Sequence, residues 1–210
     1  MSRNTRKLGR KIHYDFVEIG TSDFNTLIQK AGPKTVGLSV EPLLEYLDRL
    51  PTKPRVQKVN AAVSSTSGSL DIYYVPDNVR IEQGLPSWMK GTNSIGAPHP
   101  TVARYLAKHG LPASLVHKSK VPVLSVTRLF RRYRVGSIDF LKVDTEGHDV
   151  VIVEAYLDVA ERHPALLAKK ILFESNALSN KEAVARLRDR LRGLGYTVTP
   201  TRQDTVAVLA

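Results

Sequence analysis

Residues suited to ligand binding follow several apolar segments of this 210-residue chain. They are Glu18, Gly20, Glu41, Asn60, Asp144, Glu146, Glu174 and Asn176. In an open parallel sheet, ligands bind beyond the carboxyl ends of the strands, so these residues predict a binding site at that edge. A single carboxylate at a strand end fits a helix cap equally well. The gathering of several at one edge favours a site.

One pair of these residues has a spacing that suggests a nucleoside ligand. Glu41 lies 23 residues after Glu18, close to the roughly 20-residue offset at which an acidic side chain binds ribose hydroxyls. The loop after Glu18 holds only Gly20, whereas a pyrophosphate is usually cradled by several glycines at a helix N-terminus. S-adenosylmethionine contains no phosphate and does not demand them. The missing Gly-x-Gly-x-x-Gly therefore argues against a nicotinamide-dependent oxidoreductase.

The elements that must position these residues alternate between strand and helix. Apolar, β-branched segments begin at residues 16, 35, 56, 70, 121, 138, 171, 196 and 205. Most of them are short and nearly continuous in apolarity, which suits strands buried on both faces of a parallel sheet. Helical spacing connects Leu43, Leu44, Leu47 and Leu50, and a second stripe connects Val184, Leu187, Leu191 and Leu194. We therefore expect a doubly wound α/β fold with a mostly parallel, seven-stranded sheet.

Two parts of the chain depart from this alternation of strand and helix. Only "PTRQD" separates the segments at 196 and 205, which is too short for a parallel crossover and predicts an antiparallel hairpin. Residues 76–120 carry no clean period, so we expect an insertion or lid there within a single domain over 12–210. The stretch "TVARYLAKHG" at 101 is a helix candidate within it.

Several motifs together resemble the FkbM-like family of S-adenosylmethionine-dependent methyltransferases. They are "FVEIGTSDFNT", "LSVEP", "KVNAAVSSTSG" and "IDFLKVDTEGHD". The last holds the family's Lys-x-Asp-x-Glu-Gly, and the resemblance runs from about residue 15 to the C-terminus. It implies a class I, Rossmann-like methyltransferase fold that ends in an antiparallel hairpin.

Two positions depart from the family's pattern. Thr21, Ser22 and Asp23 follow Gly20 where the family usually has Gly-Ala-Asn-x-Gly, and Phe24 stands near the second glycine. The family's Thr-Leu-Asp reads Ser125, Val126 and Thr127 here. The first departure bears on how the cofactor would fit.

The resemblance also implies roles for individual residues. Glu18 and Gly20, with Thr21 and Ser22, would contact the methionine portion of the cofactor, and Glu41 would contact its ribose. The turn of Asn60, Ala61 and Ala62 would lie against adenine. Asp144 would close the site between cofactor and acceptor.

Methylation of a hydroxyl group needs a base to accept its proton. His148 is our first candidate because imidazole titrates near neutral pH, and a surface or capping role is the alternative for it. Asp144 or Glu146 could serve if desolvated, and Lys142 completes the motif. A magnesium site at Asp144, Glu174 and Asn176, with Glu146 nearby, is a further hypothesis, since Mg²⁺ prefers oxygen ligands.

The acceptor is less well defined by the sequence. We expect a small molecule, sugar or glycan, on which Trp88, Tyr105, His99 and His109 could stack; Trp88 and Met89 fit a small core equally well. The basic stretch "RLFRRYR", with Arg128, Arg131, Arg132 and Arg134, suits either an anionic acceptor or a solvated helix face.

Composition and charge set the remaining limits. The absence of cysteine excludes disulfides and Cys-ligated zinc. No apolar run is long enough to span a membrane, so we expect a cytoplasmic protein. The net charge is +11, and residues 1–11 hold five basic residues and no acid, which predicts a basic, flexible tail. The alternative function is therefore a nucleic-acid-binding protein with a methyltransferase-like fold, or an RNA methyltransferase.

Overall fold

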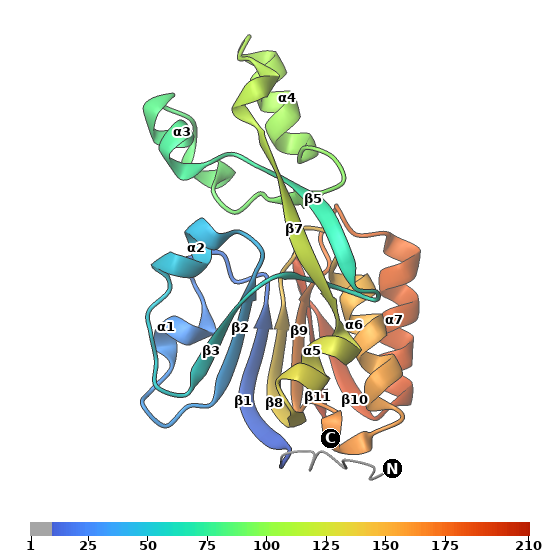
Figure 1. Ribbon diagram of the computed structural model, residues 1–210. Helices are drawn as coiled ribbons and strands as arrows, with labels where there is room; N and C mark the ends of the chain where they lie inside the picture. Colours follow the sequence, from blue (N-terminus) through green and yellow to red (C-terminus); the bar gives the residue numbers. More distant parts are fainter. Residues whose placement is uncertain (1–9) are drawn as a thin grey trace, which may run out of the picture.

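The computed structural model describes residues 10–210 and shows a mixed α/β fold (Figure 1). Most of the predicted tail, residues 1–9, lies outside the described residues. A seven-stranded sheet forms the centre. Its strand order is β10 (Tyr196–Pro200), β11 (Asp204–Leu209), β9 (Lys170–Glu174), β8 (Val135–Val143), β1 (Ile12–Ile19), β2 (Gly37–Glu41) and β3 (Val56–Asn60).

The prediction of a mostly parallel sheet ending in an antiparallel hairpin is confirmed. Strands β3, β2, β1, β8 and β9 pair in parallel. Strand β11 pairs antiparallel with both β9 and β10. The carboxyl ends of the five parallel strands consequently meet at one edge of the sheet, where the sequence predicted the site.

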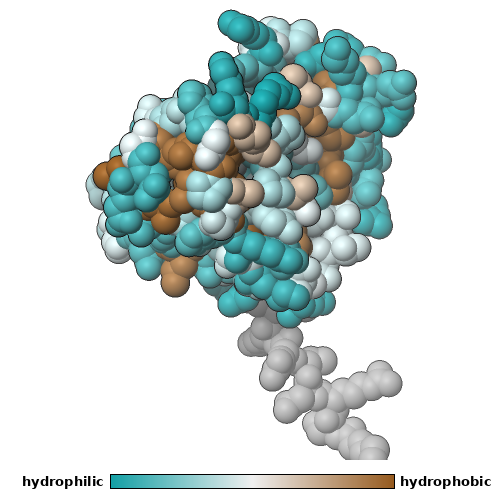
Figure 2. Space-filling model, turned by 90° about the horizontal axis from the view of Figure 1, so that it is seen from above, coloured by the Kyte–Doolittle hydropathy of each residue, from teal (hydrophilic) through white to brown (hydrophobic). Residues whose placement is uncertain are grey.

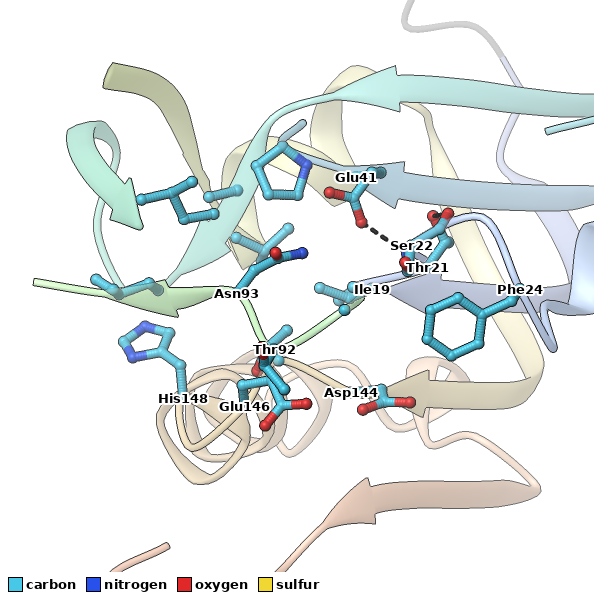
Figure 3. Close-up of a pocket in the computed structure, with 18 of the residues that line it drawn as sticks. Ile19, Thr21, Ser22, Phe24, Glu41, Thr92, Asn93, Asp144, Glu146 and His148 are labelled. Atoms are coloured by element: carbon cyan, nitrogen blue, oxygen red, sulfur yellow. Dashed lines mark hydrogen bonds between the residues drawn. The ribbon is translucent and has the colours of Figure 1, made fainter. Parts of the chain in front are cut away.

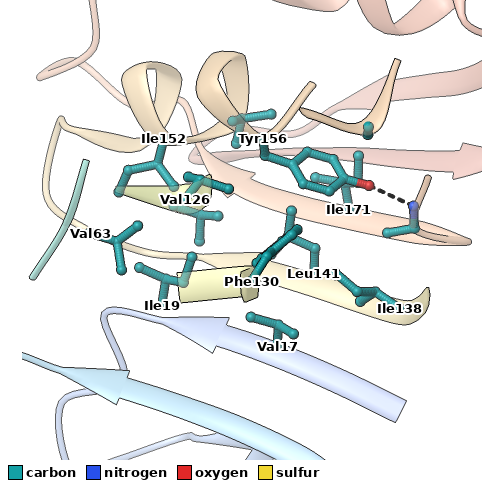
Figure 4. Packing of buried hydrophobic residues seen from close by; sticks show 14 of the residues in the cluster. Val17, Ile19, Val63, Val126, Phe130, Ile138, Leu141, Ile152, Tyr156 and Ile171 are labelled. Carbon is teal, nitrogen blue, oxygen red and sulfur yellow. Dashed lines mark hydrogen bonds between the residues drawn. The ribbon is translucent and has the colours of Figure 1, made fainter. Parts of the chain in front are cut away.

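Helices cover both faces of this sheet. On one face, α1 (Leu27–Lys30) and α2 (Leu44–Arg49) bury a small cluster around Phe16 and Ile28. The larger core lies on the opposite face, beneath α5 (Val126–Arg132), α6 (Asp149–Ala160) and α7 (Lys181–Gly193). Figure 4 shows this core, where Tyr156 fixes the chain after α6 by donating to the Leu166 carbonyl and accepting from the Ala168 amide.

A second sheet, which the sequence did not predict, has the strand order β4 (Ala62–Ser64), β7 (His117–Ser125), β5 (Gly68–Tyr74) and β6 (Ser94–Ile95). The apolar segments at 70 and 121 belong to this second sheet. Strand β5 is largely half-exposed, and β7 is mostly exposed over its first four residues and then alternates buried and exposed positions from Val121 to Val123. This pattern is typical of antiparallel strands with one solvated face, and β5 and β7 indeed pair antiparallel.

The region expected as an insertion has its own helices and its own small core. It contains α3 (Asp77–Glu82), the 3₁₀ turn η1 (Ser87–Met89), α4 (Pro100–Lys108) and the 3₁₀ turn η2 (Ala113–Leu115). Figure 1 shows these elements carried on β5 and β7, beyond the carboxyl edge of the main sheet. Their core is Val75, Leu85, Met89, Val102 and Leu106. The helix predicted from residue 101 is therefore confirmed.

The two predicted helical stripes are confirmed with one change. Helix α7 buries Val184, Leu187 and Leu191 as expected. In α2, Leu44 is 55% exposed and Tyr46 takes the buried position instead. Among the helices described over residues 10–210, none has the length and apolar character that crossing a membrane requires.

Candidate active site

A cavity of about 240 Å³ lies at the carboxyl edge of the main sheet. Figure 3 shows Glu41 on one side of it and Asp144 on the other, with Glu146 and His148 farther along. The view onto this end of the molecule shows apolar surface set between hydrophilic side chains (Figure 2). Of the predicted site residues, the cavity wall includes Gly20, Thr21, Ser22, Glu41, Ala61, Ala62, Lys142, Asp144, Glu146 and His148. The predicted motifs thus converge on one cavity.

Gly20 lets the end of β1 touch the chain that follows β8. Its φ is +78°, and an added Cβ would lie 1.9 Å from the carbonyl oxygen of Asp144. The backbone is held there because the Gly20 amide donates to Val40 and the Asp144 amide donates to Ile19. No side chain other than hydrogen fits this approach, which explains why one glycine persists in the loop.

Glu41 is buried at the end of β2 and holds two backbone segments. Its Oε2 accepts from the Ser22 amide at 2.8 Å, and its Oε1 accepts from the Leu43 amide at 2.9 Å. Burial raises the pKa of this carboxyl to about 7. Each carboxylate oxygen can accept a further hydrogen bond, so Glu41 can still bind hydroxyl groups from the cavity.

The unusual residues of the first loop leave the cavity open. Asp23 is not part of the cavity wall, and its carboxylate pairs with Lys90, which lines the cavity, at 2.8 Å and with Arg49 at 3.1 Å. The Phe24 ring is 48% exposed, lines the cavity and lies against Gly91. Ser22 adopts φ +49° and directs its amide to Glu41.

Glu18 lies beneath the cavity and is not part of its described wall. The side chain is fully buried, with one oxygen accepting from Lys142 Nζ at 3.1 Å and the other from the Leu27 amide at 2.9 Å. Burial raises its pKa and the charge of Lys142 opposes the rise. Lys142 also lies 3.6 Å from Asp144. Glu18 therefore orients Lys142 and the start of α1.

Asp149 holds the loop after β8 through hydrogen bonds, and no role was predicted for it from the sequence. Its buried carboxylate accepts from the amide and hydroxyl of Thr145, from the Gly147 amide and from the Glu174 amide, at 3.1–3.3 Å. Burial raises its pKa to about 6. Its position at the start of α6, directly after the Lys-x-Asp-x-Glu-Gly motif, is the signal that could have identified it.

Two ionisable side chains line the far end of the cavity. Burial, and then the charges of Asp144 and Asp149, raise the pKa of Glu146 to about 7. Glu146 also has φ +51°, an uncommon conformation for a residue other than glycine. Burial lowers the pKa of His148, and its Nε2 lies 3.0 Å from Ser64 Oγ. The raised pKa of Glu146 suits it to exchange a proton near neutral pH, and the lowered pKa of His148 favours its neutral, proton-accepting form.

The segment from Trp88 to Ile95, which begins within η1, forms a wall of the cavity that was not predicted from the sequence. Trp88, Lys90, Gly91, Thr92, Asn93 and Ile95 all contribute to it. Trp88 is 41% exposed, whereas Met89 is buried in the small core. Asn93 Oδ1 and Ser22 Oγ are buried in the cavity wall without a hydrogen-bond partner in the described structure. Such atoms usually bind a polar ligand or water.

Other predicted residues lie outside the cavity wall. Asn60 donates to the carbonyls of Glu41 and Pro42 and so holds the turn after β2. Asn176 donates to Glu174 at 2.6 Å. Burial, and then the charge of Glu146, raise the pKa of Glu174 to about 8.

The magnesium hypothesis stays a prediction. Over residues 10–210, the carboxylates of Asp144, Glu146 and Glu174 form no group with one oxygen of each within 4.8 Å of the others. Asn176, the remaining hypothetical ligand, lies beside Glu174.

One family comparison bears on this site. The sequence profile described as methyltransferase FkbM domain matches residues 14–198. All the residues that line the cavity lie within the matched range. No curated protein matches the chain.

Proposed function

Because the chain belongs to the FkbM methyltransferase family, we propose that it transfers a methyl group from S-adenosylmethionine to an oxygen atom of a small molecule, sugar or glycan. The observation that carries this proposal is the convergence of Gly20, Glu41, Ala62 and Asp144 on one cavity. The order of the main sheet, with β11 antiparallel between β9 and β10, supports a class I, Rossmann-like fold.

The residues of the cavity fit this cofactor chemically. Glu41 would accept hydrogen bonds from the ribose hydroxyls, and Ala61 and Ala62 would contact adenine. The unpartnered Ser22 Oγ and Asn93 Oδ1 would gain polar partners. Asp144, whose side chain is 45% exposed, would bind the amino group of the methionine portion.

When bound, S-adenosylmethionine supplies an activated methyl group, whose bond to sulfur breaks as its bond to the acceptor oxygen forms, which leaves S-adenosylhomocysteine. The protein's share is to hold the acceptor in line and to accept the hydroxyl proton. Glu146 and His148 are the two side chains placed for that proton transfer. Trp88 and Phe24 offer apolar surface for the acceptor.

Calorimetric titration with S-adenosylmethionine and S-adenosylhomocysteine tests the proposal. We expect both to bind the wild type and Glu41→Ala to weaken binding at least about tenfold, because the ribose hydroxyls lose their acceptor. Glu182→Ala is the matched control, since that carboxylate is 86% exposed on α7. The proposal fails if the wild type binds neither compound.

A second set of variants separates the two proton acceptors once an acceptor is found by screening. Glu146→Gln and His148→Asn remove one base each, and the larger fall in kcat identifies the base, with about 100-fold expected. Affinity for S-adenosylhomocysteine should change little in both.

The basic surface favours one alternative, an RNA methyltransferase or RNA-binding protein. Arg128, Arg131, Arg132 and Arg134 are exposed and form no ion pair with other residues between 10 and 210. Salt-dependent RNA binding that survives deletion of residues 1–11 but is lost in Arg128→Ala/Arg131→Ala would support it. If the same RNA binding is seen and S-adenosylmethionine does not bind, the protein is an RNA-binding protein without methyltransferase activity.

A further inference from the structure

His99 begins α4 in a way that fixes the position of its proton. Its Nδ1 accepts a hydrogen bond from the Thr101 amide at 3.2 Å. A neutral imidazole whose Nδ1 is an acceptor carries its proton on Nε2. Burial lowers the pKa of His99, which favours the neutral ring that this hydrogen bond requires. Asn, Asp, Ser and Thr are the usual N-caps, so capping alone does not explain a histidine here.

The protonated nitrogen of His99 faces the far end of the cavity. His99 Nε2 lies 3.5 Å from Glu146 Oε2, which is longer than an ordinary N–H···O hydrogen bond, and catalytic contacts of this kind often shorten only when the substrate binds. The His99 side chain is only 8% exposed, and that of Glu146 is 23% exposed. Within residues 10–210, His99 is the only cationic or imidazole side chain within 4.0 Å of the Glu146 carboxylate.

The contact joins two segments that are far apart in the chain. Glu146 belongs to the loop after β8, which hydrogen bonds to Asp149 hold in place. The positive φ of Glu146 limits the rotamers that its side chain can adopt. His99 belongs to the region carried on β5 and β7. Both ends of the pair are thus anchored, one by a helix cap and the other by a hydrogen-bonded loop.

We infer that His99 is a positioning residue, which orients the Glu146 carboxylate through Nε2–H so that Glu146 accepts the proton of the acceptor hydroxyl. This inference rests on the proposed function. The proton leaves the hydroxyl oxygen and joins the Glu146 carboxylate, and the His99 proton stays on Nε2. The region between β5 and β7 thereby completes the proton-accepting end of the site.

His99→Asn separates positioning from helix capping. Asparagine is a good N-cap, so the midpoint of thermal unfolding should stay within about 2 °C of the wild type. The shorter amide does not reach Glu146. His109→Asn is the matched control, because His109 ends the same helix and stacks on Tyr105, away from the cavity wall.

Nitrogen-15 NMR of labelled histidines tests the contact directly, with no acceptor required. We expect His99 in the Nε2–H form, with an Nε2–H resonance that moves in Glu146→Gln but not in His109→Asn. An Nδ1–H form, or a resonance that ignores Glu146→Gln, would overturn the inference.

Kinetics test the consequence. With an acceptor found by screening, His99→Asn should lower kcat about tenfold while the Kd of S-adenosylhomocysteine stays within about twofold. An unchanged kcat would overturn the positioning role. If the wild type binds neither cofactor form, the proposed function fails, and the NMR result still decides whether the pair exists.

Discussion

At the residue scale, Glu41 connects the two loops that would enclose a nucleoside. Its carboxylate binds the amide of Ser22 in the first loop and the amide of Leu43 at the start of α2. The side chain is 2% exposed. Because its pKa is about 7, its charge changes across the neutral range.

This charge change predicts a pH-dependent affinity for S-adenosylhomocysteine. Ribose hydroxyls donate to the ionised carboxylate, and ionisation is largely complete at pH 8 and slight at pH 6, so affinity should rise about tenfold from pH 6 to pH 8. Calorimetry at both values measures it. Glu41→Gln should bind more weakly and without this pH dependence, whereas Glu146→Gln should keep it. Equal wild-type affinity at the two pH values would contradict the prediction.

Gly20 offers a prediction on stability with a close control. Gly20→Ala places a Cβ 1.9 Å from the Asp144 carbonyl at φ +78°, so we expect a loss of at least about 2 kcal/mol. Gly96→Ala has a similar φ of +81° but open space around the Cβ, and it should lose about 1 kcal/mol. Chemical denaturation measures both. Equal losses would show that backbone conformation, not the contact with Asp144, requires Gly20.

At the element scale, a group of charges ties the segment after η1 to the rest of the site. Asp77 on α3 pairs with Arg49 on α2 at 2.8 Å and with Arg80 at 2.7 Å. Asp23 in the first loop pairs with Arg49 and Lys90. The carboxylates of Asp23 and Asp77 are 5% and 12% exposed. These pairs therefore resist solvent screening better than surface pairs do.

Weakening these ion pairs should make the segment of residues 86–95 more accessible to solvent. In Asp77→Asn we expect amide hydrogen exchange of residues 86–95 to become about three to ten times faster, with little change in the main sheet. Asp189→Asn breaks a pair whose carboxylate is 76% exposed on α7 and should leave this segment unchanged. Unaltered exchange in Asp77→Asn would show that the small core alone holds the segment.

At the scale of the whole molecule, the large core beneath α5, α6 and α7 and the small core around Met89 differ in size and in the elements that they hold together. The large core includes Leu141 on β8 and spans the main sheet. The small core includes Met89 and holds the elements carried on β5 and β7. Both side chains are 1% exposed. Separate clusters often unfold as separate units.

Matched core substitutions test this separation. Leu141→Ala should cost about 3 kcal/mol of global stability and lower the unfolding midpoint by roughly 6–12 °C. Met89→Ala should accelerate exchange in α4 while lowering the midpoint much less. If both variants lower the midpoint equally, the two clusters unfold as one unit.

Local sequence patterns predicted the parallel strands, the C-terminal hairpin and fewer than half of the residues that line the cavity. Strand ends and short loops depend on neighbouring residues, so "PTRQD" between two apolar segments already implies a hairpin. The sequence did not show that the apolar segment at 70 pairs in a second sheet, because strand propensity does not identify a strand's partner. Its half-exposed pattern became evident only in the structure.

The sequence by itself determined the fold class, the family and the edge of the sheet at which the site lies, since these follow from residue order and from motifs that are contiguous in the chain. Only the tertiary structure decided that Asp23 pairs with Lys90 of the cavity wall, that Asn93 lines the cavity, and that His99 lies beside Glu146. Such contacts join residues tens of positions apart. They depend on how two sheets are placed relative to each other, which no local periodicity encodes.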